Sequence, residues 1–391
     1  MNEVNQDKNQ VKSDCTSIKV LHLIDSGGLY GAEVMLLNLV KSQVALGLKP
    51  MILSVGDLGV GEKPLEKAAI EQGLKVKAIR FKSGLNVRAS ISLLSFAKSQ
   101  GYDVIHSHGY KFNILLGLWP KVFRKIPFIS TLHGYVNAKK YSKMWINEVL
   151  DRFFIKRADL VVLVNRVMLE NPVIKSIQLS NYVVIDNGID VSSKPDDAVV
   201  SNTFKNFMAG HDKILGYVGR LSPEKGIKVL LNALKIVNND HLVGVVIIGS
   251  GSQYDELNEM TSLLALERNI LFLGYIDNPV SYMKQFDALI MPSFTEGLPI
   301  TLLEAMNAKV PVIASSVGGI PDVLNESSCG YLVKSGNVEA LANSITFLID
   351  TPLDAEAKVN RAYRRVCDSY SSEKMAKEYE NAYQQCILKY V

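Results

Sequence analysis

Residues 288–306 read Ala288-Leu-Ile-Met-Pro-Ser-Phe-Thr-Glu296-Gly-Leu-Pro299-Ile-Thr-Leu-Leu-Glu304-Ala-Met306. The four apolar residues at 288–291 are typical of a buried strand. Pro299 suits the first position of a helix, because the N–H group that proline lacks would have no intrahelical partner there. The stretch therefore predicts a strand, a loop and a short helix in succession.

Two carboxylates frame the start of this predicted helix. Glu296 falls in the preceding loop and Glu304 falls more than one turn inside the helix, so the free amide groups of the first turn point between them. Such a terminus binds phosphate or polar hydroxyl groups, and carboxylates beside it accept hydrogen bonds from vicinal diols. The stretch predicts a site for a sugar that carries a phosphate, with backbone N–H groups from Gly297, Leu298 and Ile300 but not from Pro299.

A second segment supplies the opposite charge. It reads Ile214-Leu-Gly-Tyr-Val-Gly219-Arg220-Leu-Ser-Pro-Glu-Lys225-Gly226, which predicts a strand, a turn and a helix that begins near Gly226. Arg220 and Lys225 flank the turn. A guanidinium group offers a planar fork to phosphate oxygens and an ammonium group offers a mobile point charge, so the pair suits a diphosphate that leaves with negative charge.

Apolar, β-branched runs alternate with amphipathic segments along almost the whole chain. This pattern indicates parallel sheets covered by helices on both faces. The segment 191–210 contains no clear element and is interpreted as a linker and the entry to a second unit. Two doubly wound units are expected, with strands at 18–24, 51–54, 76–79, 104–106, 128–131, 160–164 and 183–185, and then at 214–218, 243–248, 270–272, 288–291, 310–314 and 331–333.

Several glycine and polar residues come directly after predicted strands. Ligands bind at the carboxyl ends of strands in open parallel sheets, so these residues can line one cavity if the two sheets face each other. His106 and His108 share one strand end, but two histidines without a third acid or thiol are weak grounds for a metal site. The residues at strand ends are Gly28, His108, His133, Asn187, Arg220, Gly249, Glu296 and Gly318.

In combination, these motifs make the chain resemble the retaining glycosyltransferases of the GT-B fold, and family four (glycosyl transferases group 1) among them. The resemblance covers nearly the whole chain from about residue 18. It implies an α/β fold of two doubly wound, Rossmann-like domains that face each other across a cleft. It is carried by Gly27-Gly28 with Gly31-Ala-Glu33, by His133 in Thr-Leu-His-Gly, by Asn187-Gly188-Ile-Asp190, by Gly219-Arg220 with Lys225-Gly226, and by Glu296 to Glu304.

The resemblance also implies roles for individual residues. His133 and Glu296 are expected near the transferred sugar, and Glu304 is expected to accept hydrogen bonds from the ribose hydroxyls of the donor. Arg220 and Lys225 are expected to stabilise the departing diphosphate, so that no metal and no other cofactor is required. The remaining donor-binding residues are expected to be Gly28, Asn187, Gly249, Tyr275 at the nucleobase, Gly297, Leu298 and Ile300.

The expected organisation follows from the same resemblance. A flexible tail (1–17) precedes an acceptor-binding domain (18–190) and a nucleotide-sugar-binding domain (191–371). The last helix (372–391) is expected to cross back and complete the first domain.

The expected activity is transfer of a hexosyl-type sugar from a nucleotide-diphosphate sugar to an acceptor hydroxyl with retention of configuration. UDP is the preferred nucleotide, and bacterial-type surface polysaccharide or glycolipid assembly is the preferred setting. The acceptor stays open among lipid-linked, saccharide and small-molecule compounds. The alternatives are a sugar-nucleotide epimerase of related architecture, a phosphorylase-like enzyme, and a catalytically inactive GT-B binding subunit; the intact motifs favour transfer.

Length and composition limit the class of protein. A chain of 391 residues is long enough for two domains, and a hydrophobic fraction of 48% is ordinary for a globular protein. No apolar run is long enough to cross a bilayer, the first residues are polar, and the four cysteines lack metal-ligand spacing. We therefore expect a cytoplasmic protein.

The net charge of +4 conceals an asymmetry. Residues 1–190 hold 25 Lys and Arg against 16 Asp and Glu, whereas the remainder holds 18 against 23. A basic first half suits peripheral association with an anionic membrane or an anionic acceptor, and a solvated face is the alternative. Nucleic acid is not an expected partner, because no aromatic-interleaved basic stripe occurs. The basic clusters are Lys121/Arg124/Lys125, Lys139/Lys140/Lys143 and Arg152/Lys156/Arg157.

Overall fold

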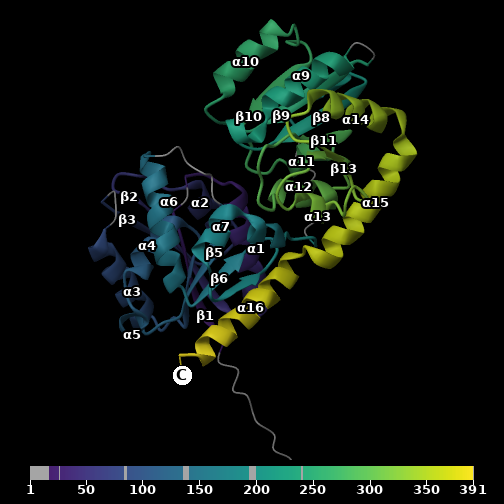
Figure 1. The fold of residues 1–391 in the computed structure, drawn as a ribbon. Helices are drawn as coiled ribbons and strands as arrows, with labels where there is room; N and C mark the ends of the chain where they lie inside the picture. Colours follow the sequence, from purple (N-terminus) through teal and green to yellow (C-terminus); the bar gives the residue numbers. More distant parts are fainter. Residues whose placement is uncertain are drawn as a thin grey trace, which may run out of the picture.

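The computed structural model describes residues 17–25, 27–82, 86–134, 141–192, 200–238 and 241–390. The chain forms two lobes, each built on one parallel sheet, and two long C-terminal helices run along both lobes (Figure 1). The predicted tail lies outside the described residues except for Ser17, and so do Lys139 and Lys140 of one basic cluster.

The first lobe contains a seven-stranded sheet in the order β3-β2-β1-β4-β5-β6-β7. Its central strands are buried on both faces, as expected for apolar, β-branched strands between two layers of helices. The strands are β1 Lys19–Ile24, β2 Lys49–Asp57, β3 Val76–Phe81, β4 Val104–Ser107, β5 Phe128–Leu132, β6 Leu160–Leu163 and β7 Tyr182–Val184. The helices are α1 Gly31–Ala45, α2 Pro64–Glu71, α3 Val87–Ser99, α4 Tyr110–Gly117, α5 Lys121–Arg124, α6 Lys143–Phe154 and α7 Pro172–Ile177, with short 3-10 helices η1 Ile155–Arg157 and η2 Arg166–Glu170.

The second lobe contains a six-stranded sheet in the order β10-β9-β8-β11-β12-β13. The strands are β8 Lys213–Val218, β9 Val243–Ile248, β10 Ile270–Gly274, β11 Ala288–Met291, β12 Val312–Ser315 and β13 Tyr331–Val333. The helices are α8 Asn202–Ala209, α9 Ile227–Val237, α10 Tyr254–Leu263, α11 Val280–Met283, α12 Ile300–Asn307, α13 Ile320–Val323, α14 Val338–Asp350, α15 Pro352–Ser369 and α16 Ser372–Leu388, with the 3-10 helix η3 Pro223–Lys225.

All predicted strands are present, which confirms the α/β class with two doubly wound sheets. The interpretation of 191–210 as a segment without an element was wrong, because helix α8 lies within it. The Ser201 hydroxyl accepts a hydrogen bond from the Phe204 amide and caps this helix, and Phe204 packs into the core. The helix after β11 begins at Ile300 and not at Pro299, which is the N-cap residue.

The chain passes between the lobes twice, and the two passages lie side by side. The amide of Ile189 donates to the Tyr370 carbonyl at 2.9 Å, and the Ser372 amide donates to the Ile189 carbonyl at 2.7 Å. Gly188 allows this approach, because a Cβ atom there would lie 2.5 Å from the Ser371 carbonyl oxygen. These hydrogen bonds hold the two chain passages together at the junction between the lobes.

Helix α16 packs against the first lobe although it follows the second lobe in sequence. Its Tyr379 and Tyr383 are buried beside α1 and the first sheet. The Tyr383 hydroxyl lies 2.8 Å from His106 Nδ1 and accepts from the Gln43 amide at 3.1 Å. The buried aromatic rings and their hydrogen bonds fix this helix on the first lobe. Among the described helices, none has the length and apolar character that crossing a bilayer requires.

Candidate active site

A cavity of about 620 Å³ lies between the lobes, at the carboxyl ends of both sheets. This is the size of a typical small-molecule site. The predicted site residues that line it are His133, Asn187, Arg220, Lys225, Gly249, Tyr275, Glu296, Gly297, Leu298, Ile300 and Glu304. Gly28 does not line the cavity, whereas its neighbours Leu29 and Tyr30 do.

Glu296 and Lys225 form an ion pair at the cavity wall. The Lys225 ammonium lies 2.7 Å from Glu296 Oε1, and the Ser293 hydroxyl donates to the same oxygen at 2.7 Å. The Glu296 side chain is only 7% exposed, and within the described residues no hydrogen bond engages its Oε2. The pair therefore holds a cation and a carboxylate oxygen in fixed positions at the cavity, where a polar ligand can reach both.

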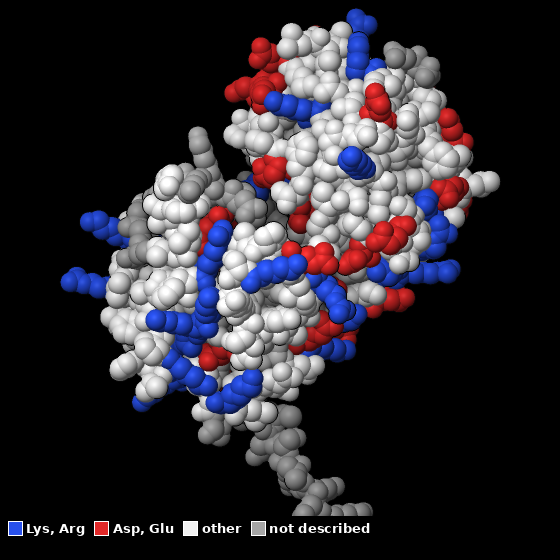
Figure 2. Space-filling model, in the orientation of Figure 1, with Lys and Arg blue, Asp and Glu red and all other residues white. Residues whose placement is uncertain are grey.

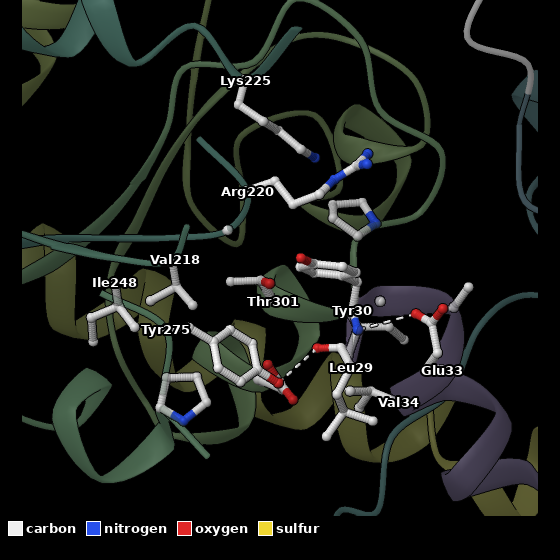
Figure 3. A pocket seen from close by; sticks show the side chains of 18 of the residues that line it. Leu29, Tyr30, Glu33, Val34, Val218, Arg220, Lys225, Ile248, Tyr275 and Thr301 are labelled. Carbon is white, nitrogen blue, oxygen red and sulfur yellow. Dashed lines mark hydrogen bonds between the residues drawn. The ribbon is translucent and has the colours of Figure 1, made fainter. Parts of the chain in front are cut away.

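Arg220 adds a second cation to the same region. Its guanidinium group lies 3.5 Å from Glu224 and stacks over the ring of Tyr30 at 5.7 Å. Half of its side chain is exposed, and the residue lines the cavity. Figure 3 shows Arg220 and Lys225 reaching into the same space from the second lobe, next to Tyr30 of the first. Two neighbouring cations of this kind suit a diphosphate.

Close packing of three loops brings these groups together. Gly226 has φ +66°, and a Cβ atom there would lie 2.1 Å from the Pro292 carbonyl oxygen, just after β11. Gly249 has φ +142°, and a Cβ atom there would collide with the carbonyl oxygen of Gly219. Glycine is required at both positions by the positive φ and by the lack of space. The loops after β8, β9 and β11 consequently meet, which places Lys225 beside Glu296.

Glu304 is a carboxyl group without a hydrogen-bond partner among the described residues. It lies on α12 and lines the cavity. Burial raises the pKa of this carboxyl to about 7. The carboxyl is half-buried at the cavity wall, so ionising it is unfavourable in the free protein, and a ligand that donates hydrogen bonds to the carboxylate favours the charged form. The position and chemistry suit the hydroxyl pair of a ribose.

Tyr30 and Tyr275 join the two lobes across the cavity. The Tyr275 hydroxyl donates to the Leu29 carbonyl at 3.3 Å, and the rings of Tyr30 and Tyr275 meet edge to face with centroids 6.5 Å apart (Figure 3). The Tyr30 amide donates to Glu33 Oε2 at 3.0 Å, so the start of α1 fixes this loop. Tyr30 was not among the residues predicted from the sequence, where its only signal was an aromatic residue inside the glycine-rich turn. Gly28 leaves the space for its ring, because a Cβ atom there would overlap Tyr30.

His133 lines the cavity at the end of β5, and three further histidines lie behind it. Burial lowers the pKa of His133 and of His22 to about 4, so both rings are neutral. The Gln43 amide oxygen accepts from His22 Nε2 at 2.9 Å, so His22 Nδ1 is an acceptor and His108 Nε2 donates to it at 3.0 Å. The buried nitrogens His108 Nδ1 and His133 Nε2 have no hydrogen-bond partner among the residues that the structure describes, and the two rings are 5.9 Å apart.

His22, His106 and His108 form a buried group whose candidate ligand atoms all lie within 4.8 Å of one another. His22 was not predicted to join this group, because it lies in the middle of β1 and not at a strand end. Hydrogen bonds account for most of the ring nitrogens: His106 binds the hydroxyls of Tyr383 and Thr131, both at 2.8 Å, and His22 binds Gln43 and His108. The group is explained as a hydrogen-bond network between the first sheet and α16.

Asn187 connects the lobes by a direct hydrogen bond. Its side-chain amide donates to the Leu298 carbonyl at 2.9 Å, and the residue is 6% exposed. The loop that carries Glu296 and Gly297 is thereby tied to the chain passage at 187–189. Asn187 therefore both lines the cavity and positions the loop that contains Glu296.

Comparison with known proteins assigns the family. Residues 30–193 match the family model described as Glycosyltransferase Family 4, and residues 201–365 match the model described as Glycosyl transferases group 1. The two models together cover most of the chain, one on each lobe. The chain belongs to the glycosyltransferases of family 4, also called group 1.

Relatives of this glycosyltransferase include two Escherichia coli proteins. The O-antigen biosynthesis glycosyltransferase WclY is 25% identical over 378 residues, which cover 94% of this chain and 98% of WclY. UDP-Gal:alpha-D-GlcNAc-diphosphoundecaprenol alpha-1,3-galactosyltransferase is 25% identical over 279 residues, 68% of this chain and 71% of that protein. The solved structure of Anabaena HepE in complex with UDP and glucose has a TM-score of 0.80 at 19% identity, over 94% of this chain and all of HepE. These matches confirm the predicted GT-B fold for the glycosyltransferase.

Proposed function

We propose that this glycosyltransferase moves a hexose-type sugar from a UDP-sugar to an acceptor hydroxyl with retention of the anomeric configuration, in bacterial-type polysaccharide or glycolipid assembly. The observation that carries the proposal is the group formed by Arg220, the Lys225–Glu296 pair and the unpaired Glu304 around one cavity. The names of the relatives, O-antigen biosynthesis and galactosyl transfer from UDP-Gal, support the donor class and the setting.

The donor is proposed to bind mainly to the second lobe. Its ribose hydroxyls donate to Glu304, and its diphosphate lies between Arg220 and Lys225, whose charges match it. The nucleobase lies at the Gly274–Tyr275 turn next to Gly249. The sugar hydroxyls bind Glu296 and the backbone N–H groups of Gly297, Leu298 and Ile300.

The acceptor is proposed to approach from the first lobe, past Tyr30 and His133. The acceptor oxygen forms the new bond to the anomeric carbon on the face from which the diphosphate departs. The bond from the anomeric carbon to the phosphate oxygen breaks, and the departing phosphate takes the acceptor proton. Arg220 and Lys225 stabilise the negative charge that develops on the diphosphate, so the step proceeds without a metal.

Glu296 is assigned to sugar positioning and not to covalent catalysis. Its Oε1 already accepts two hydrogen bonds, from Lys225 and Ser293, which lowers its nucleophilicity and fixes its orientation. A lipid-linked, saccharide or small-molecule acceptor is compatible with this arrangement. A cytoplasmic location is proposed on the basis of the sequence, and Cys329, Cys367 and Cys386 are free thiols, as in a reducing compartment.

The test measures binding and turnover with the full chain. UDP-glucose, UDP-galactose and UDP-N-acetylglucosamine are supplied with and without EDTA, UDP release is followed, and the anomeric configuration of the product is read by NMR. We expect one UDP-sugar to turn over in EDTA with retention. Lys225→Ala and Arg220→Ala should each lower kcat by roughly 100-fold. Lys235→Ala, an exposed lysine at the end of α9, is the control that should retain full activity.

Three outcomes would count against the proposal. Inversion would exclude the same-face step, and loss of turnover in EDTA would exclude metal-independent departure of the diphosphate. Equal turnover in wild type and in both cation variants would remove Arg220 and Lys225 from the reaction. Binding of UDP-sugars without transfer to any acceptor or to water would favour a binding subunit.

A further inference from the structure

A second cavity of about 610 Å³ lies where the two lobes meet, and we call it the junction cavity. The first lobe contributes η2 and β7 to its lining, and the second lobe contributes α13 and α15. In Figure 1, α13 lies at the end of the second lobe that faces the first. The volume is large enough for a small molecule. The lining includes Asn165, Arg166, Tyr182, Asp186, Leu298 and Tyr370.

The junction cavity touches both of the chain passages that join the lobes. Asp186 comes directly before Asn187, whose side-chain amide donates to the Leu298 carbonyl, and Leu298 lines the active-site cavity as well. Tyr370 lies on the other passage, and its carbonyl accepts a hydrogen bond from the Ile189 amide at 2.9 Å. A ligand in the junction cavity would therefore contact the connection between the lobes and one wall of the active site.

Three side chains at this cavity have unused hydrogen-bonding capacity. Asn165 is only 3% exposed, and its side-chain oxygen accepts from the Met168 amide at 2.9 Å, but its Nδ2 has no partner among the described residues. The side chains of Arg166 and Asp186 form no hydrogen bond or ion pair within the part of the chain that the structure describes. Burial raises the pKa of the half-buried Asp186 carboxyl above its usual value. Buried polar groups are normally paired, so these donors and acceptors indicate a polar ligand.

The charges of the lining narrow the class of ligand. Two guanidinium groups, Arg166 and Arg365, face three carboxyl groups, Asp186, Asp322 and Glu326. Figure 2 likewise shows acidic and basic side chains mixed along the line where the lobes meet. A phosphate would meet the carboxylates and an amine would meet the guanidinium groups, so neither charge is favoured. Hydroxyl groups donate to carboxylates and accept from guanidinium and amide groups, so a neutral ligand with many hydroxyls fits.

An aromatic ring at the wall adds an apolar contact. The Tyr182 side chain on β7 is 47% exposed and lines the cavity. The C–H face of a sugar ring packs on an aromatic face, while its hydroxyls point to the sides. We propose that the junction cavity is a regulatory site for a neutral saccharide, which binds Asn165, Arg166 and Asp186 through its hydroxyls and packs on Tyr182.

The regulatory effect follows from the position of the site. Both lobes line the junction cavity, so saccharide affinity depends on how the lobes are placed, and the bound saccharide favours the arrangement that binds it better. Transfer requires groups from both lobes, so occupancy of the junction cavity changes kcat. This effect on the rate rests on the transfer function proposed above, whereas saccharide binding does not.

The first experiment measures saccharide binding to the full chain by saturation-transfer difference NMR, with UDP present to fill the donor site. The probes are glucose, galactose, N-acetylglucosamine, maltose and lactose. We expect at least one to bind, and Asp186→Asn/Tyr182→Ala to weaken its binding by roughly tenfold or more, because a hydrogen bond to a charged group and an aromatic contact are lost.

The matched control is Asp368→Asn/Tyr254→Ala, which makes the same chemical changes at an exposed aspartate of α15 and at a tyrosine that is 46% exposed. The control should bind the saccharide like wild type, and thermal melting shows whether each variant is folded. The site is wrong if none of the probes binds, or if the junction variant and the control bind equally. It is also wrong if Tyr30→Ala weakens binding in place of the junction variant, because the saccharide would then occupy the active site.

The second experiment measures the initial rate of UDP release with the saccharide that binds. In wild type and in the control, we expect the saccharide to change kcat by about twofold or more, and in Asp186→Asn/Tyr182→Ala we expect a much smaller change. Binding with no change of kcat in wild type would overturn the coupling to the lobes. If no UDP-sugar turned over, the transfer function would fail, and the NMR titration would still decide whether the saccharide site exists.

Discussion

At the scale of single residues, the carboxyl of Glu304 connects ligand binding to stability. Its pKa is raised to about 7 by burial, well above the usual value of 4.5. The free enzyme therefore loses stability as the pH rises from about 5 through 7, because the carboxyl must ionise inside the cavity. An ionised carboxylate is the better acceptor for two ribose hydroxyls, so donor binding should strengthen over the same range.

Glu304→Gln separates these two effects. At pH 8 we expect the variant to be more stable than wild type by on the order of 1–3 kcal/mol, because no charge has to be buried. Its UDP affinity should fall at pH 8 and become nearly independent of pH. Urea unfolding and calorimetric titration with UDP between pH 5.5 and 8.5 provide the measurement. A variant that is less stable than wild type at pH 8 would contradict this account of Glu304.

The buried histidines give a second prediction of opposite sign. The pKa of His22 and of His133 is lowered to about 4, and the pKa of His106 and of His108 is lowered well below 6.5, in all four cases chiefly by burial. The unfolded chain therefore binds more protons than the native protein below pH 6.5. Stability from these groups is fully present above pH 6.5 and is lost as the pH falls toward 4.

The dependence of the free energy of unfolding on pH can be measured. Each histidine should contribute about 1.4 kcal/mol of lost stability per pH unit in this window. His106→Gln keeps a side chain that can bond Tyr383 and Thr131 but cannot titrate. We expect its free energy of unfolding to fall less steeply than that of wild type between pH 6.5 and 5, as measured by urea denaturation. Identical slopes would show that His106 is not neutral in the native protein.

At the scale of secondary-structure elements, the turn between β8 and α9 depends on Gly226. An alanine there would place its methyl group 2.1 Å from the Pro292 carbonyl oxygen at a φ of +66°, so the turn must move away from β11. We expect Gly226→Ala to destabilise the protein by about 1–3 kcal/mol and to reduce turnover by displacing Lys225 from Glu296.

Gly210→Ala is the matched control for this element. Gly210 ends α8 with φ −94°, and a Cβ atom there would meet only the Phe207 carbonyl at 3.6 Å, an ordinary contact. We expect Gly226→Ala to have a lower melting temperature and a lower rate of UDP release than Gly210→Ala. Equal melting temperatures and equal rates of UDP release in the two variants would show that the turn at Gly226 tolerates the displacement.

The elements themselves could largely be predicted from sequence. Strands such as Val243–Ile248 are continuous apolar runs because helices cover both faces, so no alternating pattern is needed to find them. Helix α8 was missed because it is short and of its residues only Phe204 is deeply buried, while the segment before it is rich in Ser, Asp and Pro. Pro299 was placed one residue too far into α12, since proline is tolerated both at the cap and at the first helical position.

At the scale of the whole molecule, residues of both lobes line the cavity, so only part of the site could be predicted from the sequence. The cations and carboxylates of the second lobe lie in two short motifs and were found. Tyr30 and Tyr275 meet from positions far apart in the chain, and His22 joins His106 and His108 only through the pairing of β1 with β4. Contacts that depend on sheet order and on the packing of the lobes leave no local pattern in the sequence.

The connection between the lobes provides the last prediction. Arg220, Lys225 and Glu304 all belong to the second lobe, so nucleotide binding should depend mainly on that lobe, whereas transfer also requires Tyr30 and His133 of the first.

Gly188→Ala would place a methyl group 2.5 Å from the Ser371 carbonyl oxygen and force the two chain passages apart, next to the Asn187–Leu298 hydrogen bond. We expect UDP affinity to change by less than about threefold, within the 0.7 kcal/mol that such a ratio represents, while kcat falls by roughly tenfold or more. Calorimetric UDP titration and initial-rate kinetics measure the two quantities, and Gly210→Ala again serves as the control. If affinity and kcat fell by the same factor, the nucleotide would depend on both lobes, and the division of labour between them would be wrong.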